Sequence, residues 1–211
     1  MLKLYSERRA RAILQRWTPW MRELERRLGL PEPCLRAVLL REMTLMDILD
    51  PVADSLVLLY RLRWNLRRLL RLPPPAERGP ALLRKRDSSV GYAQIFGAVG
   101  IRAINFALDR GLTTAEALSL PAGRRLDPAC EEDLRLVWNR SRRSRAFNME
   151  LCALNLLCAA EEMTGRVDFP SCSPEELKLI FTRYNADTRR ITPYGEAVYG
   201  YYTAFMARRT E

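Results

Sequence analysis

The stretch "AFNMELCALNLLCAAEEMTG", residues 146–165, decides the fold. Its apolar residues fall on nearly every side of a helical projection, which is typical of a helix buried at the centre of a protein. Gly165 follows the last helical positions and is well suited to end the helix. We therefore expect this segment to form a central helix around which the rest of the chain packs.

The segments on both sides of this stretch also have helical patterns. "SPEELKLIFTRYN", residues 173–185, opens with a serine cap, a proline at the first helical position and Glu176 reaching back to the cap. No segment combines the alternating apolar and polar residues of a β-strand with the turn residues of a β-hairpin. The sequence predicts an all-α fold, with minimal β structure at most. Further helices are expected over residues 6–28, 33–49, 51–72 and 91–109, with a last one beginning near Pro193.

The domain organisation follows from length and composition. The chain has 211 residues, of which 48% are hydrophobic, enough for one domain with a real core. Three consecutive prolines, Pro73 to Pro75, end the helix predicted over 51–72. The proline- and charge-rich segment 73–89 is predicted to be a flexible loop. We therefore expect a single domain, residues 1–211, with the 51–72 helix and this loop as an insert.

The absence of histidine limits the possible chemistry. It excludes Ser-His-Asp and Cys-His catalysis, histidine-ligated zinc and imidazole acid–base catalysis. The five cysteines are an odd number, and no two of them have the spacing of a zinc site or a redox motif. We interpret them as small buried residues in a reducing compartment. The sequence implies no metal and no cofactor, and any catalytic acid must be another residue type.

The net charge of +10 favours anionic partners. The 51–72 helix carries Trp64 among arginines, and it could contact an anionic wall polymer or a membrane surface. The alternative is an ordinary amphipathic helix with a solvated arginine face. A different class of function, nucleic-acid binding, is suggested by the charge and by "WNRSRRSR" at 138–145. The arginines of the 51–72 helix are Arg61, Arg63, Arg67, Arg68 and Arg71.

Glu42 interrupts an apolar helix face. In "AVLLREMTLMDILDP", residues 37–51, it lies on the same face as Val38, Leu39 and Met46. Such a carboxylate is either paired, here by one of the many arginines, or desolvated and unpaired. In the second case its pKa rises and it keeps its proton near neutral pH, as a general acid requires. The helix pattern alone does not choose between the two states.

Two other stretches carry polar and aromatic residues at helix ends. "DSSVGYAQIF", residues 87–96, combines small residues, a glycine, a tyrosine and a glutamine, and such a bend lets a backbone approach a ligand closely. "IFTRYNAD", residues 180–187, ends a helix with a Tyr-Asn pair, and a tyrosine-rich helix follows. Taken singly, these features are also explained by a loop-to-helix transition, core packing and a helix cap.

Taken together and in this order, the three stretches resemble the lysozyme-like superfamily, specifically goose-type lysozymes and soluble lytic transglycosylases. The pieces that carry the resemblance are "LLREMT" around Glu42, "GYAQI" at Gly91 to Ile95, and "RYNAD" at 183–187 with Tyr194. The chain has Met43 where those families usually have serine, and its segment between Glu42 and Gly91 is long. The resemblance implies a lysozyme-like helical fold and a peptidoglycan glycosidase, either a muramidase or a lytic transglycosylase.

The resemblance also implies roles for individual residues. Glu42 would be the general acid that cleaves the β-1,4 bond between N-acetylmuramic acid and N-acetylglucosamine in glycan strands. Tyr92 and Gln94, with Gly91, would line the cleft, and Tyr184 and Asn185 would close the site against Glu42. Tyr194 would be a further substrate-binding residue. Other readings are a nucleic-acid-binding helical protein and a lysozyme-like module without activity.

Asp87 decides the expected outcome of the reaction. It stands four residues before Gly91, near the place where goose-type lysozymes hold a second, water-positioning aspartate. A second carboxylate about 6.5–9.5 Å from the acid predicts hydrolysis with inversion. Without one, the sugar's own groups attack and an anhydro product forms. The sequence equally allows Asp87 to be a turn or cap residue, or a partner of Arg84 or Arg86.

The N-terminus does not read as a secretory signal. "MLKLYSERRARAILQRW" is charged too early and too often, and no apolar run approaches the roughly 20 residues that span a bilayer. We therefore expect synthesis in the cytoplasm. Action at the cell wall would then follow non-classical release, or occur as part of a phage.

Overall fold

The central helix predicted from the sequence is α7, Arg145–Thr164, in a computed structural model that describes residues 3–73, 85–121 and 124–209. It packs against α2, α3, α5, α6 and α8, and most of its residues are buried. Gly165 ends it in the left-handed conformation at φ 71°, a conformation that glycine adopts without strain. The predicted core helix and its stop signal are therefore both confirmed.

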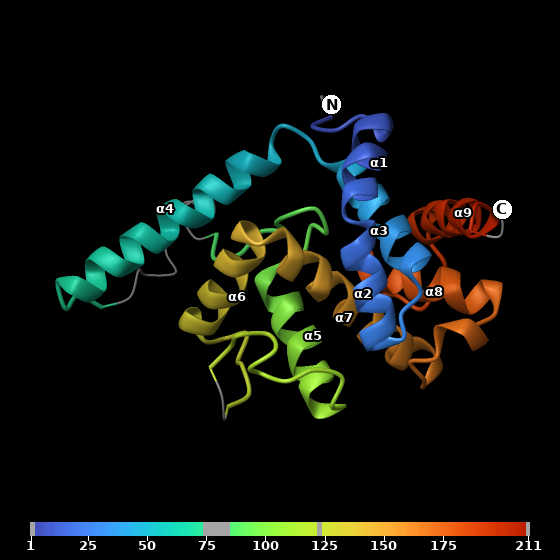
Figure 1. Ribbon diagram of the computed structural model, residues 1–211. Coiled ribbons are helices and arrows are strands. Elements are labelled where there is room, and N and C mark those ends of the chain that lie inside the picture. The colour runs from blue at the N-terminus through green and yellow to red at the C-terminus, as the bar shows by residue number, and fades with distance from the viewer. Residues whose placement is uncertain (1–2, 74–84, 122–123, 210–211) are drawn as a thin grey trace.

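The remaining helices surround α7 on two sides (Figure 1). α5 and α6 cover one side, and α3, α8 and α9 pack together on the other, with α1 and α2 outside α3. The described residues form no strand, only isolated bridges between Lys3 and Asp47 and between Val90 and Ile95. The all-α prediction is confirmed. The bounds are α1 Glu7–Arg16, α2 Thr18–Leu28, α3 Glu32–Leu45, α4 Asp50–Leu69, α5 Gly97–Asp109, α6 Glu131–Arg143, α8 Pro174–Asn185 and α9 Pro193–Ala207.

Several of the predicted helix boundaries are wrong, and the helix expected over 33–49 ends at Leu45. The helix expected over 6–28 is two helices, α1 and α2, separated at Trp17. Pro19 at the start of α2 lacks a backbone N–H and fits only the first turn of a helix, which explains the break. The helix expected from Gly91 begins only at Gly97, because residues 90–95 form a tight turn closed by Val90 and Ile95.

α4 differs from the other helices in its position. It extends away from the helical body as an arm, as Figure 1 shows. It corresponds to the basic helix predicted over 51–72. The predicted loop 73–89 falls mostly on residues 74–84, which lie outside the described residues; residues 85–89 are irregular. No helix in the described ranges has the length and apolar character needed to cross a bilayer.

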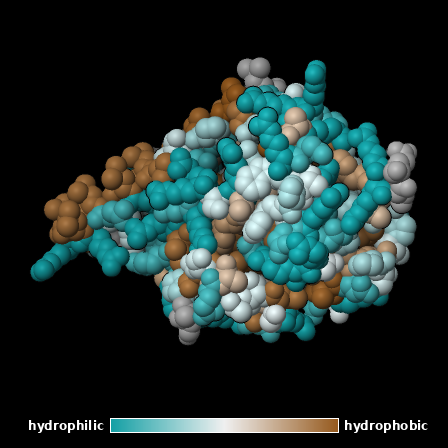
Figure 2. All heavy atoms as spheres, in the orientation of Figure 1, coloured by the Kyte–Doolittle hydropathy of each residue, from teal (hydrophilic) through white to brown (hydrophobic). Residues whose placement is uncertain are grey.

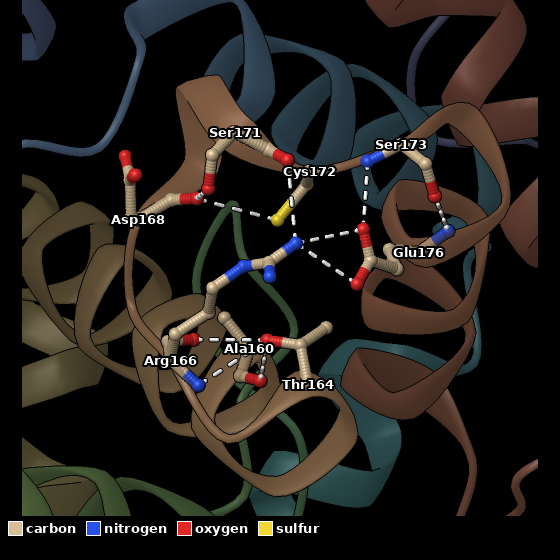
Figure 3. Close-up of polar contacts among 8 residues, drawn as sticks. All are labelled: Ala160, Thr164, Arg166, Asp168, Ser171, Cys172, Ser173 and Glu176. Carbon is tan, nitrogen blue, oxygen red and sulfur yellow. Dashed lines mark hydrogen bonds and ion pairs between the residues drawn. The ribbon is translucent and has the colours of Figure 1, made fainter.

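The connection from α7 to α8 is fixed by polar contacts (Figure 3). The Arg166 guanidinium donates to both carboxylate oxygens of Glu176 at 2.9 Å and to the Ser171 carbonyl at 3.2 Å. Glu176 also accepts from the Ser173 backbone N–H, and Ser173 Oγ accepts from that of Glu176, so the predicted capping box is formed. These contacts fix the start of α8, whose other end carries Tyr184 and Asn185.

Candidate active site

Glu42 is a buried carboxyl whose hydrogen-bond partner is a tyrosine. It lies near the end of α3, whose neighbouring positions Leu39, Leu40 and Met43 are fully buried, and only 7% of Glu42 is exposed. Tyr194, in the first turn of α9, donates its hydroxyl proton to Glu42 Oε1. Among the residues that the structure describes, Glu42 forms no ion pair. Of the two states that the sequence left open, the structure has the unpaired one.

The surroundings of Glu42 favour its protonated form. Burial raises the pKa of Glu42 from the ordinary 4.5 to about 7, although the Tyr194 hydrogen bond and the nearby charge of Arg41 lower it. A carboxyl with this pKa holds its proton in a substantial fraction of molecules at neutral pH. The arrangement can therefore supply a proton to a bound ligand, which is the chemistry that a general acid performs.

Two side chains from other helices complete a cluster with Glu42 and Tyr194. The Cys152 thiol of α7 and the Tyr184 hydroxyl of α8 influence each other's pKa, and the charge of Glu42 raises the pKa of both groups. Burial is the largest cause of the raised pKa at Cys152, Tyr184 and Tyr194 alike. We call these four residues the Glu42 cluster. Three helices from the second half of the chain thus meet α3 at the Glu42 carboxyl.

The turn at residues 90–95 is tied to this cluster. The Tyr184 hydroxyl donates to the Ala93 carbonyl at 2.6 Å, so one tyrosine contacts both the turn and the Glu42 cluster. The turn itself is unusual, because Gly91 has φ 72° and Gln94 has φ 47°. Gln94 fills its own turn: its Nε2 donates to the Gly91 carbonyl at 2.9 Å, and its Oε1 accepts from Ser89 Oγ at 2.9 Å.

Asn148 of α7 forms hydrogen bonds with the 90–95 turn, and the sequence analysis did not identify this residue. Its Nδ2 donates to the Val90 carbonyl at 2.9 Å and to Ser141 Oγ at 2.7 Å, while its Oδ1 accepts from the Ala93 N–H at 2.9 Å. The side chain is fully buried. An asparagine inside an apolar helix could have indicated this role, because a buried side-chain amide requires hydrogen-bond partners.

Replacing Gly91 with alanine is expected to destabilise the protein. A Cβ at Gly91 would lie 2.4 Å from Asn148 Cγ, whereas one at Gly165, which has nearly the same φ, meets nothing within 4 Å. Both substitutions carry the left-handed strain, but only Gly91→Ala forces the buried amide to move. We expect Gly91→Ala to lower the free energy of unfolding by about 1–3 kcal/mol more than Gly165→Ala. Equal losses in urea denaturation would contradict this packing.

The Tyr92 side chain contacts residues outside the turn, whereas that of Gln94 bonds within it. Its buried ring packs edge-on against Tyr5, with ring centroids 6.2 Å apart, and Arg145 lies over it at 5.3 Å. The segment that carries Tyr5 also runs beside the end of α3, because the Leu4 N–H donates to the Met46 carbonyl at 3.0 Å. The N-terminal segment therefore connects the end of the Glu42 helix to the turn.

The structure places Asp87 at the start of α5. One carboxylate oxygen accepts from the Ser88 and Gly97 N–H groups at 2.9 Å, and the other accepts from Ala98 at 3.0 Å. This is the capping role that the sequence had left open, and the helix dipole favours a negative charge there. A carboxylate whose oxygens already accept three amides is poorly placed to activate a water molecule.

The remaining residues that the sequence analysis singled out differ in their exposure to solvent. Asn185 is exposed at the end of α8. Arg61 does not belong to the predicted basic surface, because it is buried, stacks over Trp138 at 4.2 Å and donates to Asn139 at 3.1 Å. Trp138, the aromatic residue of the basic stretch 138–145, is also fully buried and is not available to stack on a base.

Two cavities of about 290 and 670 Å³ lie away from the Glu42 cluster, one between α1, α3 and α9 and the other beside α5. In the described ranges, no group of three or more His, Cys, Asp or Glu side chains could hold a metal ion.

No protein-family model, curated protein or solved structure matches this chain.

Proposed function

We propose that the protein is a peptidoglycan glycosidase with Glu42 as its general acid. The observation that carries the proposal is the buried Glu42 carboxyl, with a pKa of about 7 and a hydrogen bond from Tyr194. Three separate motifs of the sequence contribute to this site: α3, the 90–95 turn and the end of α8, which Tyr184 links. They are the same three that resemble the lysozyme-like superfamily.

In the proposed reaction, Glu42 donates its proton to the oxygen that links N-acetylmuramic acid to N-acetylglucosamine. Protonation turns that oxygen into a good leaving group, and the bond from the muramic acid C1 to this oxygen breaks. Burial keeps the proton on Glu42 until a sugar arrives, as it does in lysozyme, where a glutamic acid in an apolar pocket protonates the glycosidic oxygen. Tyr194 orients the carboxyl through its hydrogen bond.

The position of Asp87 favours the route that forms an anhydro sugar. Its carboxylate is engaged by the first amides of α5, so it is not free to act as a base for water. In the anhydro route the 6-hydroxyl of the muramic acid attacks C1, and its proton returns to the Glu42 carboxylate. A C–O bond forms as another breaks, no water is consumed, and Glu42 ends protonated as it began.

The glycan would bind between the Glu42 helix and the 90–95 turn. Gly91, Tyr92 and Gln94 shape the turn, and the exposed amide of Asn185 would donate to or accept from a sugar hydroxyl. Because only 7% of Glu42 is exposed, the groups that cover it would have to shift when a strand binds. Such a step would make glycan access part of the reaction.

The test is the mass of the muropeptides released from purified peptidoglycan. We expect the wild-type protein to release disaccharide muropeptides with an anhydro end, lighter by one water than hydrolysed ones. A hydrolysed product would keep Glu42 as the acid but overturn the route assigned from Asp87. No soluble product from intact sacculi, with a protein that unfolds cooperatively, would overturn the glycosidase proposal itself.

A further inference from the structure

α4 exposes one largely apolar side, while its other side packs on the body. Leu62 is 65% exposed and Leu69 is 79% exposed, although leucine is usually buried. Figure 2 shows this hydrophobic surface along the arm, facing away from the body. The exposed apolar residues of the helix and its end are Val52, Leu58, Leu59, Leu62, Leu66, Leu69, Leu70 and Leu72.

The spacing of these residues makes one continuous face. At 3.6 residues per turn, Val52, Leu59, Leu62, Leu66 and Leu69 fall on the same side of the helix. The helix has 20 residues, so the face is about 30 Å long. Contiguous apolar surface of this extent on a protein marks a site of interaction. We call it the α4 leucine face.

The opposite side of α4 is already occupied by the protein. Val57 is buried with Val90 and Trp138. Asp54 accepts from Ser88 Oγ at 2.8 Å, and Arg68 pairs with Glu132 at 3.0 Å. The helix is therefore oriented by its inner contacts, and it cannot bury the α4 leucine face by rotating without breaking them.

The charges beside the α4 leucine face select the partner. Arg63 lies at one edge of it, and Arg67 and Arg71 follow beyond that edge. None of the three forms an ion pair within the described part of the chain, although Arg67 Nε donates to the Pro73 carbonyl at 2.6 Å. Both acidic residues of the helix are turned away: Asp54 faces the body, and Asp50 accepts from the Asp47 N–H at 2.9 Å. An apolar face with arginines beside it that form no ion pair fits a lipid surface with anionic headgroups.

From these observations we propose that α4 docks the protein on an anionic lipid bilayer. The helix lies in the plane of the interface, with the leucines among the acyl chains and the arginines among the headgroups. A second copy of the chain is a poorer occupant, because pairing two leucine faces brings arginines together while the acidic residues of α4 point elsewhere. An anionic polymer alone offers no apolar phase for the leucines. The proposal is independent of the glycosidase assignment.

The test is co-sedimentation with vesicles of phosphatidylglycerol and phosphatidylcholine, compared with phosphatidylcholine alone. We expect the wild-type protein to bind the anionic vesicles and to bind them less as salt is raised. Changing Leu62, Leu66 and Leu69 together to asparagine should weaken binding by at least about tenfold, because each leucine loses its transfer from water. These side chains are exposed in the free protein, so the variant should unfold at the same temperature as the wild type.

Three further variants separate the contributions of the leucines and of the arginines. Leu69→Asn alone should weaken binding, whereas Met206→Asn, an exposed apolar residue on α9, should not. Changing Arg63, Arg67 and Arg71 to glutamine should remove the preference for anionic vesicles. Absence of binding to anionic vesicles, or binding that survives the triple leucine change, would overturn the proposal. So would a dimer that the triple change dissociates while the wild type ignores vesicles, since a second copy would then cover the face.

Discussion

Replacing Glu42 with glutamine is expected to lower the rate of peptidoglycan cleavage by about 10²–10⁴-fold, the usual contribution of a general acid. Glutamine keeps the shape of the side chain and an oxygen that accepts the Tyr194 hydroxyl, but it has no proton of suitable acidity to give. The loss should appear in the rate and leave glycan binding nearly unchanged. Released muropeptides, quantified by mass over time, measure it.

Glu32→Gln is the matched control for this loss. Glu32 is also buried and lies on the same helix, but it is paired with Arg36, which further donates to Thr18 Oγ1 at 2.6 Å. The two substitutions remove the same chemical group from α3, and only one removes the proposed acid. We expect Glu32→Gln to retain wild-type cleavage. Equal activity of the Glu42→Gln variant and the wild type would show that cleavage does not depend on Glu42.

The Glu42→Gln variant should also be more stable than the wild type above pH 7. Below about pH 4.5 the carboxyl is protonated in both the folded and the unfolded protein, so it contributes nothing to the pH dependence. Between pH 4.5 and 7 the unfolded state ionises first, and the folded state is progressively disfavoured. At about 1.4 kcal/mol per pH unit, the full effect above pH 7 is about 3 kcal/mol.

Urea denaturation of both proteins at several pH values measures this difference. The free energy of unfolding of Glu42→Gln minus that of the wild type should grow between about pH 4 and pH 8 and then level off. Glu32→Gln should behave in the opposite way at neutral pH, because it weakens an ion pair that stabilises the folded state. If Glu42→Gln proved less stable than the wild type at about pH 8, Glu42 would have to be a paired carboxylate.

The sequence predicted the helices well where local signals agree with packing. Local sequence was enough to predict three features that the structure has. They are the apolar helix α7, its end at Gly165 and the capping box at the start of α8. The break at Trp17 was missed because Pro19 can begin a helix as well as interrupt one, and only the packing of α1 and α2 decides between the two.

The site was harder to predict than the fold. Periodicity placed Glu42 on an apolar face, but its ionisation depends on how deeply it is buried and on the hydrogen bond from Tyr194, which is more than 150 residues away in the sequence. The turn at residues 90–95 was read as helix because its closure depends on Asn148, more than fifty residues later. The arginines of α4 were read as one surface, although Arg61 packs on Trp138. Long-range contacts of this kind leave no local pattern.

Titration of the carboxyl carbon of Glu42 measures whether this residue keeps its proton near neutral pH. In protein labelled with ¹³C at glutamate side chains, the Glu42→Gln variant identifies the Glu42 signal by its loss. We predict that this signal titrates with a midpoint at about pH 7. A midpoint at or below the ordinary 4.5 would mean that the carboxyl is ionised at neutral pH, and it would contradict both the general-acid role and the pH dependence of stability.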